Sequence, residues 1–134
     1  AQADKAHIYV ALDKLESMVK SGREKPNLAQ ILEFVSAKPV VTLDEKGGGD
    51  MAMIGFGRKN QFNKLMKIIE NDHKKRKIQQ YALIFTDNEN VIRPYLDRLR
   101  KLTGLEPVFI KQSSPIYALM AGHDALAIGY VMEN

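Results

Sequence analysis

Apolar and polar positions along the chain alternate with two different periods, and each change of period marks an expected element. Short apolar runs rich in β-branched residues predict strands over residues 7–12, 38–44, 51–57, 81–85, 107–111 and 125–132. The glycines at 47–49, followed by Asp50, separate the second run from the third. This turn signal predicts that those two strands form a hairpin.

Between these runs, apolar residues recur at the spacing of amphipathic helices. The expected helices cover residues 12–22, 27–36, about 58–77, 86–103 and 113–121. Gly22 and Gly104 provide C-terminal stop signals, and Asp13 and Asn88 are candidate N-caps. The pattern predicts one two-layer α/β domain over residues 1–134, with a mixed sheet of about six strands and helices mainly on one face.

Composition narrows the class of protein. The 134 residues contain 45% hydrophobic residues, no cysteine and a net charge of +4. No apolar run approaches the roughly 20 residues that cross a bilayer, so we expect a cytoplasmic protein that is not transmembrane. Basic residues at 74–77 fall at the end of a predicted helix, where they complement the helix dipole, and we expect no nucleic-acid partner. Because the first residue is Ala1, we expect a segment of a longer protein.

One turn has the character of an anion site. Gly55, Phe56, Gly57 and Arg58 lie between a predicted strand and a predicted helix, where free backbone N–H groups receive phosphates or carboxylates. The third glycine of a dinucleotide fingerprint would fall on Asn60, so that motif is absent. A plain tight turn is the favoured interpretation, and a phosphate or nucleotide site is the alternative.

The chain contains every residue type of a serine-hydrolase triad near its carboxyl end, in Ser113, Ser114, His123 and Asp124. No G-x-S-x-G elbow is present, and adjacent His123 and Asp124 place the carboxylate poorly for orienting the imidazole. The three histidines are scattered singly, which disfavours a metal site. We therefore expect no enzyme activity, no catalytic residue, no cofactor and no metal.

Four segments resemble the DegV family, in the family's order. LDKLESMVKSGR (12–23) resembles "VDTLEYLKKGGR", and KPV (38–40) resembles "KPIL". GRKNQFNKLMKIIE (57–70) is similar to "RTKKKALKKLVELL", and SPIYALMAGHDALAIGY (114–130) is similar to "GPVIGAHTGPGALGIGY". The resemblance covers nearly the whole chain and corresponds to the family's carboxy-terminal lobe.

The resemblance implies a bacterial protein that binds a long-chain fatty acid between two lobes and presents its carboxylate to a partner kinase. An upstream DegV-like lobe would supply hydroxyl groups. In this chain the resemblance implies a head group near Arg23 and Arg58 and an acyl chain against Leu32, Tyr117 and Met120. Leu28 and Leu119 are expected to line the same tunnel.

Two departures from the family pattern favour an alternative. The family's histidine falls on Met120 and its arginine on Phe56. His123 is a candidate replacement, and Arg58 would share a strand face with position 56 if the strand continued. A buried carboxylate without donors is costly. The alternative is therefore a degenerate lobe that dimerises or regulates a dihydroxyacetone-kinase-like partner or fused domain.

Overall fold

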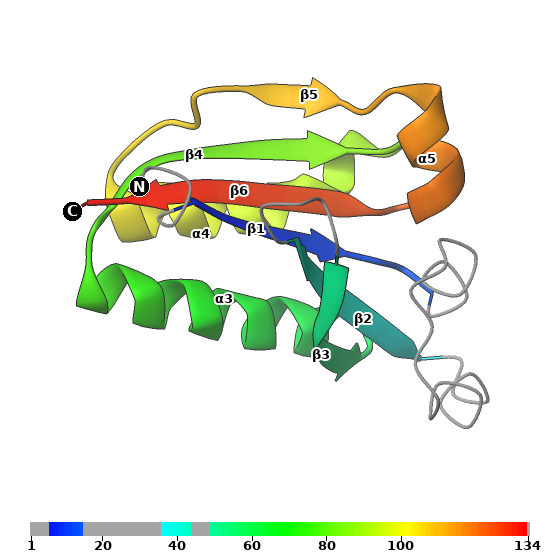
Figure 1. Ribbon diagram of the computed structural model, residues 1–134, viewed down its shortest axis with the longest axis horizontal. Coiled ribbons are helices and arrows are strands. Elements are labelled where there is room, and N and C mark those ends of the chain that lie inside the picture. Colours follow the sequence, from blue (N-terminus) through cyan, green and yellow to red (C-terminus); the bar gives the residue numbers. More distant parts are fainter. Residues whose placement is uncertain (1–5, 15–35, 44–48, 134) are drawn as a thin grey trace.

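The computed structural model describes residues 6–14, 36–43 and 49–133 (Figure 1). Its strands are β1 (Ala6–Ala11), β2 (Ala37–Leu43), β3 (Gly49–Phe56), β4 (Ile78–Phe85), β5 (Ile110–Gln112) and β6 (Leu126–Met132). Its helices are α3 (Arg58–Lys75), α4 (Arg93–Thr103) and α5 (Pro115–Ala121), and a 3₁₀ turn, η2, covers Glu89–Ile92. The helices predicted over 12–22 and 27–36 lie almost wholly outside the described residues.

The strands form a mixed six-stranded sheet in the order β3-β2-β1-β6-β4-β5. Strands β4 and β5 are parallel, and the other neighbouring pairs are antiparallel. The predicted hairpin is the β2–β3 pair. The α/β class and the mixed sheet of about six strands are thus confirmed.

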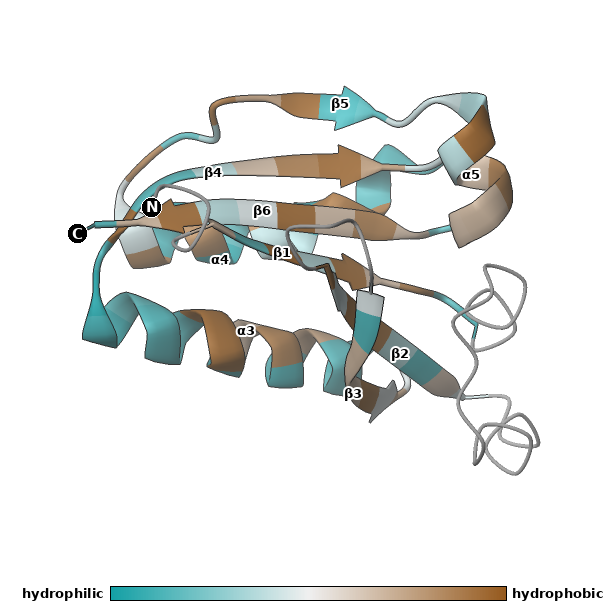
Figure 2. Ribbon diagram, viewed as in Figure 1, coloured by the Kyte–Doolittle hydropathy of each residue, from teal (hydrophilic) through white to brown (hydrophobic). Residues whose placement is uncertain are grey.

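The main core lies between α3, α4 and one face of the sheet. Leu126, Ile128 and Tyr130 alternate along β6 and join the same cluster as Leu65 on α3 and Leu99 on α4. This alternation follows from the strand period of two, which sends every second side chain to the same face. Figure 2 shows hydrophobic stretches along β1, β4 and β6. Helices α3 and α4 therefore cover one face, as predicted.

Helix α3 approaches the sheet closely at its first turns. A Cβ added at Gly55 would lie 2.5 Å from Gln61 Cα, so only glycine fits there. Gln61 is fully buried, and its Nε2 donates to the carbonyls of Leu12 at 2.9 Å and Pro39 at 3.1 Å. This amide satisfies two backbone acceptors and fixes α3 to the end of β1 and the start of β2.

Several predicted boundaries differ from the observed ones, and three of them have a physical explanation. Strand β4 begins at Ile78, because the basic stretch ends at a turn in which the Ile78 N–H donates to His73 Nδ1 at 3.1 Å. The helix predicted over 86–103 is divided into η2 and α4, with Pro94 in the first turn of α4, where its missing N–H costs little. Strand β5 begins at Ile110 rather than residue 107, because it is an edge strand with only three residues in register with β4.

Candidate functional site

An apolar groove opens on the face of the sheet away from α3 and α4, with a volume of about 560 Å³. Its lining includes Val10 on β1 and Ala127 on β6, whose chain neighbours Ala11 and Leu126 belong to the main core. Alternate residues of the same strands thus form the core on one side and much of the groove floor on the other. The volume is within the roughly 300–1,000 Å³ typical of small-molecule sites.

A straight row of side chains crosses the groove floor. Strand register pairs Val41 with Val10, Val10 with Ala127, Ala127 with Ile84, and Ile84 with Lys111. Residues directly opposite each other on neighbouring strands share a face of the sheet, and all five residues line the groove. The row is therefore apolar from β2 to β4 and ends in a lysine on the edge strand β5.

Helix α5 forms one wall of the groove. The Ser114 hydroxyl accepts a hydrogen bond from the Tyr117 N–H, and Pro115 occupies the first turn, so this short helix has a regular start. Tyr117 and Met120 line the groove and are 67% and 44% exposed. The wall is thus apolar and open to a ligand.

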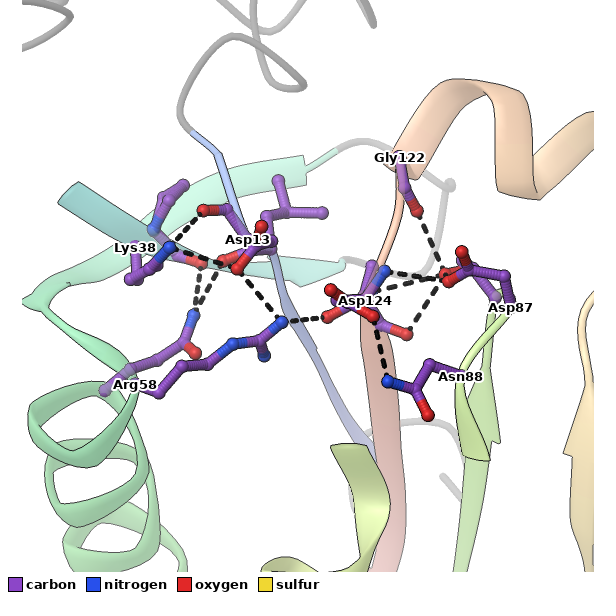
Figure 3. A network of polar contacts seen from close by, with 12 residues as sticks. Asp13, Lys38, Arg58, Asp87, Asn88, Gly122 and Asp124 are labelled. Atoms are coloured by element: carbon purple, nitrogen blue, oxygen red, sulfur yellow. Dashed lines mark hydrogen bonds and ion pairs between the residues drawn. The ribbon is translucent and has the colours of Figure 1, made fainter. Parts of the chain in front are cut away.

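Polar residues at the end of β4 hold the turn between α5 and β6. The Thr86 hydroxyl donates to the Gly122 carbonyl at 2.9 Å and accepts from the Ala125 N–H at 3.2 Å. Asp124 has a positive φ of 55°, which aspartate tolerates better than most residues. Its N–H donates to Asp87 Oδ1 at 2.8 Å, and its Oδ1 accepts from Asn88 Nδ2 at 3.1 Å (Figure 3). These bonds fix the turn next to the groove.

Arg58 connects this turn to a second polar group (Figure 3). Its Nη2 donates to the Asp124 carbonyl at 2.6 Å and lies 3.0 Å from Asp13 Oδ1. Lys38 Nζ also contacts Asp13 Oδ1 at 3.0 Å and donates to the Asp13 carbonyl at 2.9 Å. Both cations are thus engaged by protein groups and tie β1, β2, α3 and the α5–β6 turn together.

His123 Nδ1 lies 2.6 Å from Asp87 Oδ2. The hydrogen bond from His123, followed by the bond from the Asp124 N–H, lowers the pKa of Asp87 to about 2. Because the folded-state pKa is depressed, this carboxylate stabilises the fold above its unfolded pKa of about 4, and that contribution is lost as the pH falls toward 2. We expect carboxyl ¹³C NMR titration to place the Asp87 midpoint near 2.

In the same titration, His123→Gln should raise the pKa of Asp87 toward its ordinary value. Urea unfolding of Asp87→Asn from pH 6 to 2 should show a smaller loss of stability than wild type, since the variant lacks the titrating group. A wild-type Asp87 that titrates near its ordinary pKa would contradict this account.

The predicted site residues have different placements. Tyr117 and Met120 line the groove, whereas Arg58, His123 and Leu119 are outside its lining as described. The His123 side chain is 90% exposed and is paired with Asp87. The prediction that a helix begins at Arg58 is confirmed, because Gly57, with a φ of 88°, turns the chain and Arg58 begins α3, so Arg58 does not share a strand face with position 56.

Arg23, Leu28 and Leu32 lie outside the described residues, so their predicted roles stay predictions.

The turn at residues 55–58 has fewer free donors than an anion site needs. The Phe56 N–H donates to Asn60 Oδ1 at 2.9 Å, and the Gly57 N–H donates to the Ser36 carbonyl at 2.8 Å. The two glycines are accounted for by close packing at 55 and by a positive φ at 57. These contacts favour the tight-turn interpretation over a phosphate site.

Within the described residues, no group of three potential metal ligands occurs, and no helix has the length and apolar content to span a membrane. Ser114 caps α5, and His123 pairs with Asp87 rather than with its neighbour Asp124.

The sequence analysis did not predict that Asp13, Lys38 and Asp87 lie close together and take part in the polar contacts around Arg58 and Asp124. Asp13 and Asp87 follow β1 and β4. Both strands run antiparallel to β6, so their carboxyl ends lie at the same end of the sheet. Lys38, near the start of β2, and Asp124, just before β6, lie at this end too. The available signal was the repeated placement of charged residues at strand ends, but using it required the strand order.

Comparisons with known proteins place this geometry in a family. A family model described as "Uncharacterised protein, DegV family" matches residues 1–133. No curated protein matches the sequence.

Several solved structures share the fold. A DegV family protein from Eubacterium eligens, loaded with heptadecanoic acid, has a TM-score of 0.81 at 15% identity, with 97% of this chain and 46% of that chain covered. A fatty acid binding DegV family protein from Streptococcus agalactiae has a TM-score of 0.78 at 22% identity, with 99% of this chain and 47% of that chain covered. The Streptococcus pneumoniae Fatty Acid Kinase (Fak) B3 protein loaded with linoleic acid has a TM-score of 0.76 at 17% identity, with 97% of this chain and 46% of that chain covered. The chain thus spans less than half the length of these proteins.

Proposed function

The chain belongs to the DegV family, and from that premise we propose that it binds the acyl chain of a fatty acid in the apolar groove. The observation that carries the proposal is the groove itself, with its volume of about 560 Å³ and a floor formed by Val10, Val41, Ile84 and Ala127. The free energy falls when an apolar ligand covers such a surface and removes it from water.

The properties of structural relatives support the same ligand class. The proteins from Eubacterium eligens and Streptococcus pneumoniae are described as loaded with heptadecanoic and linoleic acid, respectively. Met120 fits this ligand class because its flexible side chain adapts to irregular apolar surfaces. It lines the groove from α5. We propose that it contacts the acyl chain rather than the carboxylate.

We propose further that this chain acts as the carboxy-terminal lobe of a longer, cytoplasmic protein. An upstream lobe would complete the carboxylate site, and the pair would present the carboxylate to a partner kinase. The support is that the chain covers 46% of the Streptococcus pneumoniae protein, whose name refers to a fatty acid kinase. Arg58 and His123 are proposed to lie toward this partner lobe, where they stabilise the complex rather than line the groove, and Arg23 keeps its predicted role near the head group.

The test is organic extraction of the protein purified from cells, followed by mass spectrometry and by uptake of a labelled long-chain fatty acid. We expect about one fatty acid per chain, either copurified or taken up. A protein that is empty and also fails to take up the added fatty acid would contradict the proposed function.

A second candidate function has its own supporting observation. Ile116 and Leu119 on α5 are 69% and 82% exposed and lie outside the groove lining as described. These apolar side chains favour a lobe that dimerises or regulates a dihydroxyacetone-kinase-like partner. Sedimentation of the wild type and of Leu119→Glu distinguishes this candidate, since an apolar interface through α5 would be weakened by the charge.

A further inference from the structure

Lys111 is the only charged side chain among the described residues that line the groove. It lies on the edge strand β5, in register with Ile84 on β4. Its ammonium group lies 5.2 Å from the centre of the Phe109 ring, two residues earlier in the chain. The aromatic ring attracts and orients the ammonium group, and because the ring has no net charge, the positive charge of Lys111 is not neutralised.

Two other cations at the strand ends, Arg58 and Lys38, are already paired. Arg58 contacts Asp13 and the Asp124 carbonyl, and Lys38 contacts Asp13. Lys111 has no carboxylate partner among the described residues. A cation with no carboxylate partner at the rim of an apolar groove is the arrangement that an anionic amphiphile requires, since the two parts of such a ligand need different surroundings.

We infer that Lys111 holds the anionic head group of the ligand, whose chain lies along the row from Ile84 to Val41. This inference rests on the proposed function and adds a specificity-determining residue to it. From Lys111 to Val41 the row crosses four strand spacings, roughly 19 Å, and the part from Ile84 to Val41 crosses three, roughly 14 Å, which accommodates much of an extended long-chain acyl group. The ligand class is therefore a long-chain carboxylate in preference to the uncharged alcohol of the same length.

Hydrogen bonds made by the residues after Lys111 hold this rim of the groove in place. Gln112 Nε2 donates to the Thr86 carbonyl at 3.1 Å, and the Ser113 N–H donates to the Phe85 carbonyl at 2.8 Å. These bonds fix the segment that follows β5 against the end of β4. The rim at Lys111 is thus held in place before a ligand arrives, which lowers the ordering cost of binding.

The test compares a long-chain fatty acid with the fatty alcohol of equal length, by displacement of a fluorescent acyl probe. Lys111→Met keeps the aliphatic stem and removes the charge, and Lys111→Arg keeps the charge. We expect Lys111→Met to weaken binding of the acid by about fivefold and to leave the alcohol nearly unchanged, with Lys111→Arg close to wild type. The matched control is Lys101→Met on α4, which should bind both ligands as wild type does.

Salt provides an independent readout, because exposed charge pairs are screened. Added salt should weaken acid binding in the wild type and have less effect in Lys111→Met. If Lys111→Met binds the acid as tightly as wild type, or loses acid and alcohol equally, the inference is overturned while the proposed function stands. If the wild type binds neither ligand, the proposed function itself fails.

Discussion

A glutamate in place of Val10 is expected to reduce fatty-acid affinity about 100-fold or more. Val10 occupies the middle of the apolar row, between Val41 and Ala127. A carboxylate there is either buried against the acyl chain at a cost of several kcal/mol or displaces that chain, and about 2.8 kcal/mol corresponds to 100-fold. Lys111 lies roughly 14 Å away, three strand spacings, so it cannot neutralise the new charge. Displacement of a fluorescent acyl probe measures the effect.

The matched control for the groove is Leu119→Glu, which places the same charge on the exposed side of α5 and should bind normally. Ala127→Phe provides a second variant without a charge, since the larger ring would fill the floor of the groove. Circular dichroism and thermal unfolding report whether each variant is folded. Normal affinity in a folded Val10→Glu protein would show that the acyl chain binds elsewhere.

Gly55→Ala is expected to lower the free energy of unfolding by about 3 kcal/mol, at the upper end of typical overpacking costs. The new Cβ would lie 2.5 Å from Gln61 Cα and 2.6 Å from Gln61 N. Both atoms are backbone, so no flexible side chain can move aside. Helix α3 would have to shift away from β3, weakening the Gln61 bonds to Leu12 and Pro39. Urea unfolding followed by circular dichroism measures the change.

Gly129→Ala is the control for Gly55→Ala, because Gly129 also lies within a strand and has no positive φ. The nearest atoms to its added Cβ are His7 O and Ile8 Cγ1, both at 3.9 Å, an ordinary contact distance. Its stability should therefore change by less than about 1 kcal/mol. Equal effects of the two substitutions would refute the packing explanation at Gly55.

Local signals in the sequence predicted the described elements well. The strand period identified all six strands, and the stop at Gly104 is where α4 ends, with a left-handed φ of 72°. Tyr117 and Met120, which the resemblance places against the acyl chain, both line the groove, and their contact with a ligand stays a prediction. Each of these features depends on residues within a few positions of one another.

Features that depend on distant residues were not predictable in the same way. The pair Asp87–His123 joins positions 36 residues apart, and its proximity follows from strand order rather than from local pattern. The helix start at Arg58 was predicted, but its contacts with Asp13 and the Asp124 carbonyl join residues 45 and 66 positions away along the chain. The family pattern has a glycine where this chain has Asp124, and the observed φ of 55° explains why a glycine suits that position.

Strand β6 alternates between two surfaces, because Leu126 and Ile128 pack in the core while Ala127 faces the groove. Under the proposed function, selection for folding and selection for ligand binding act on different residues of one strand. Substitutions at the groove positions can change the preferred chain length or head group without repacking the helices. Ligand preference in such a sheet can evolve while the architecture is conserved.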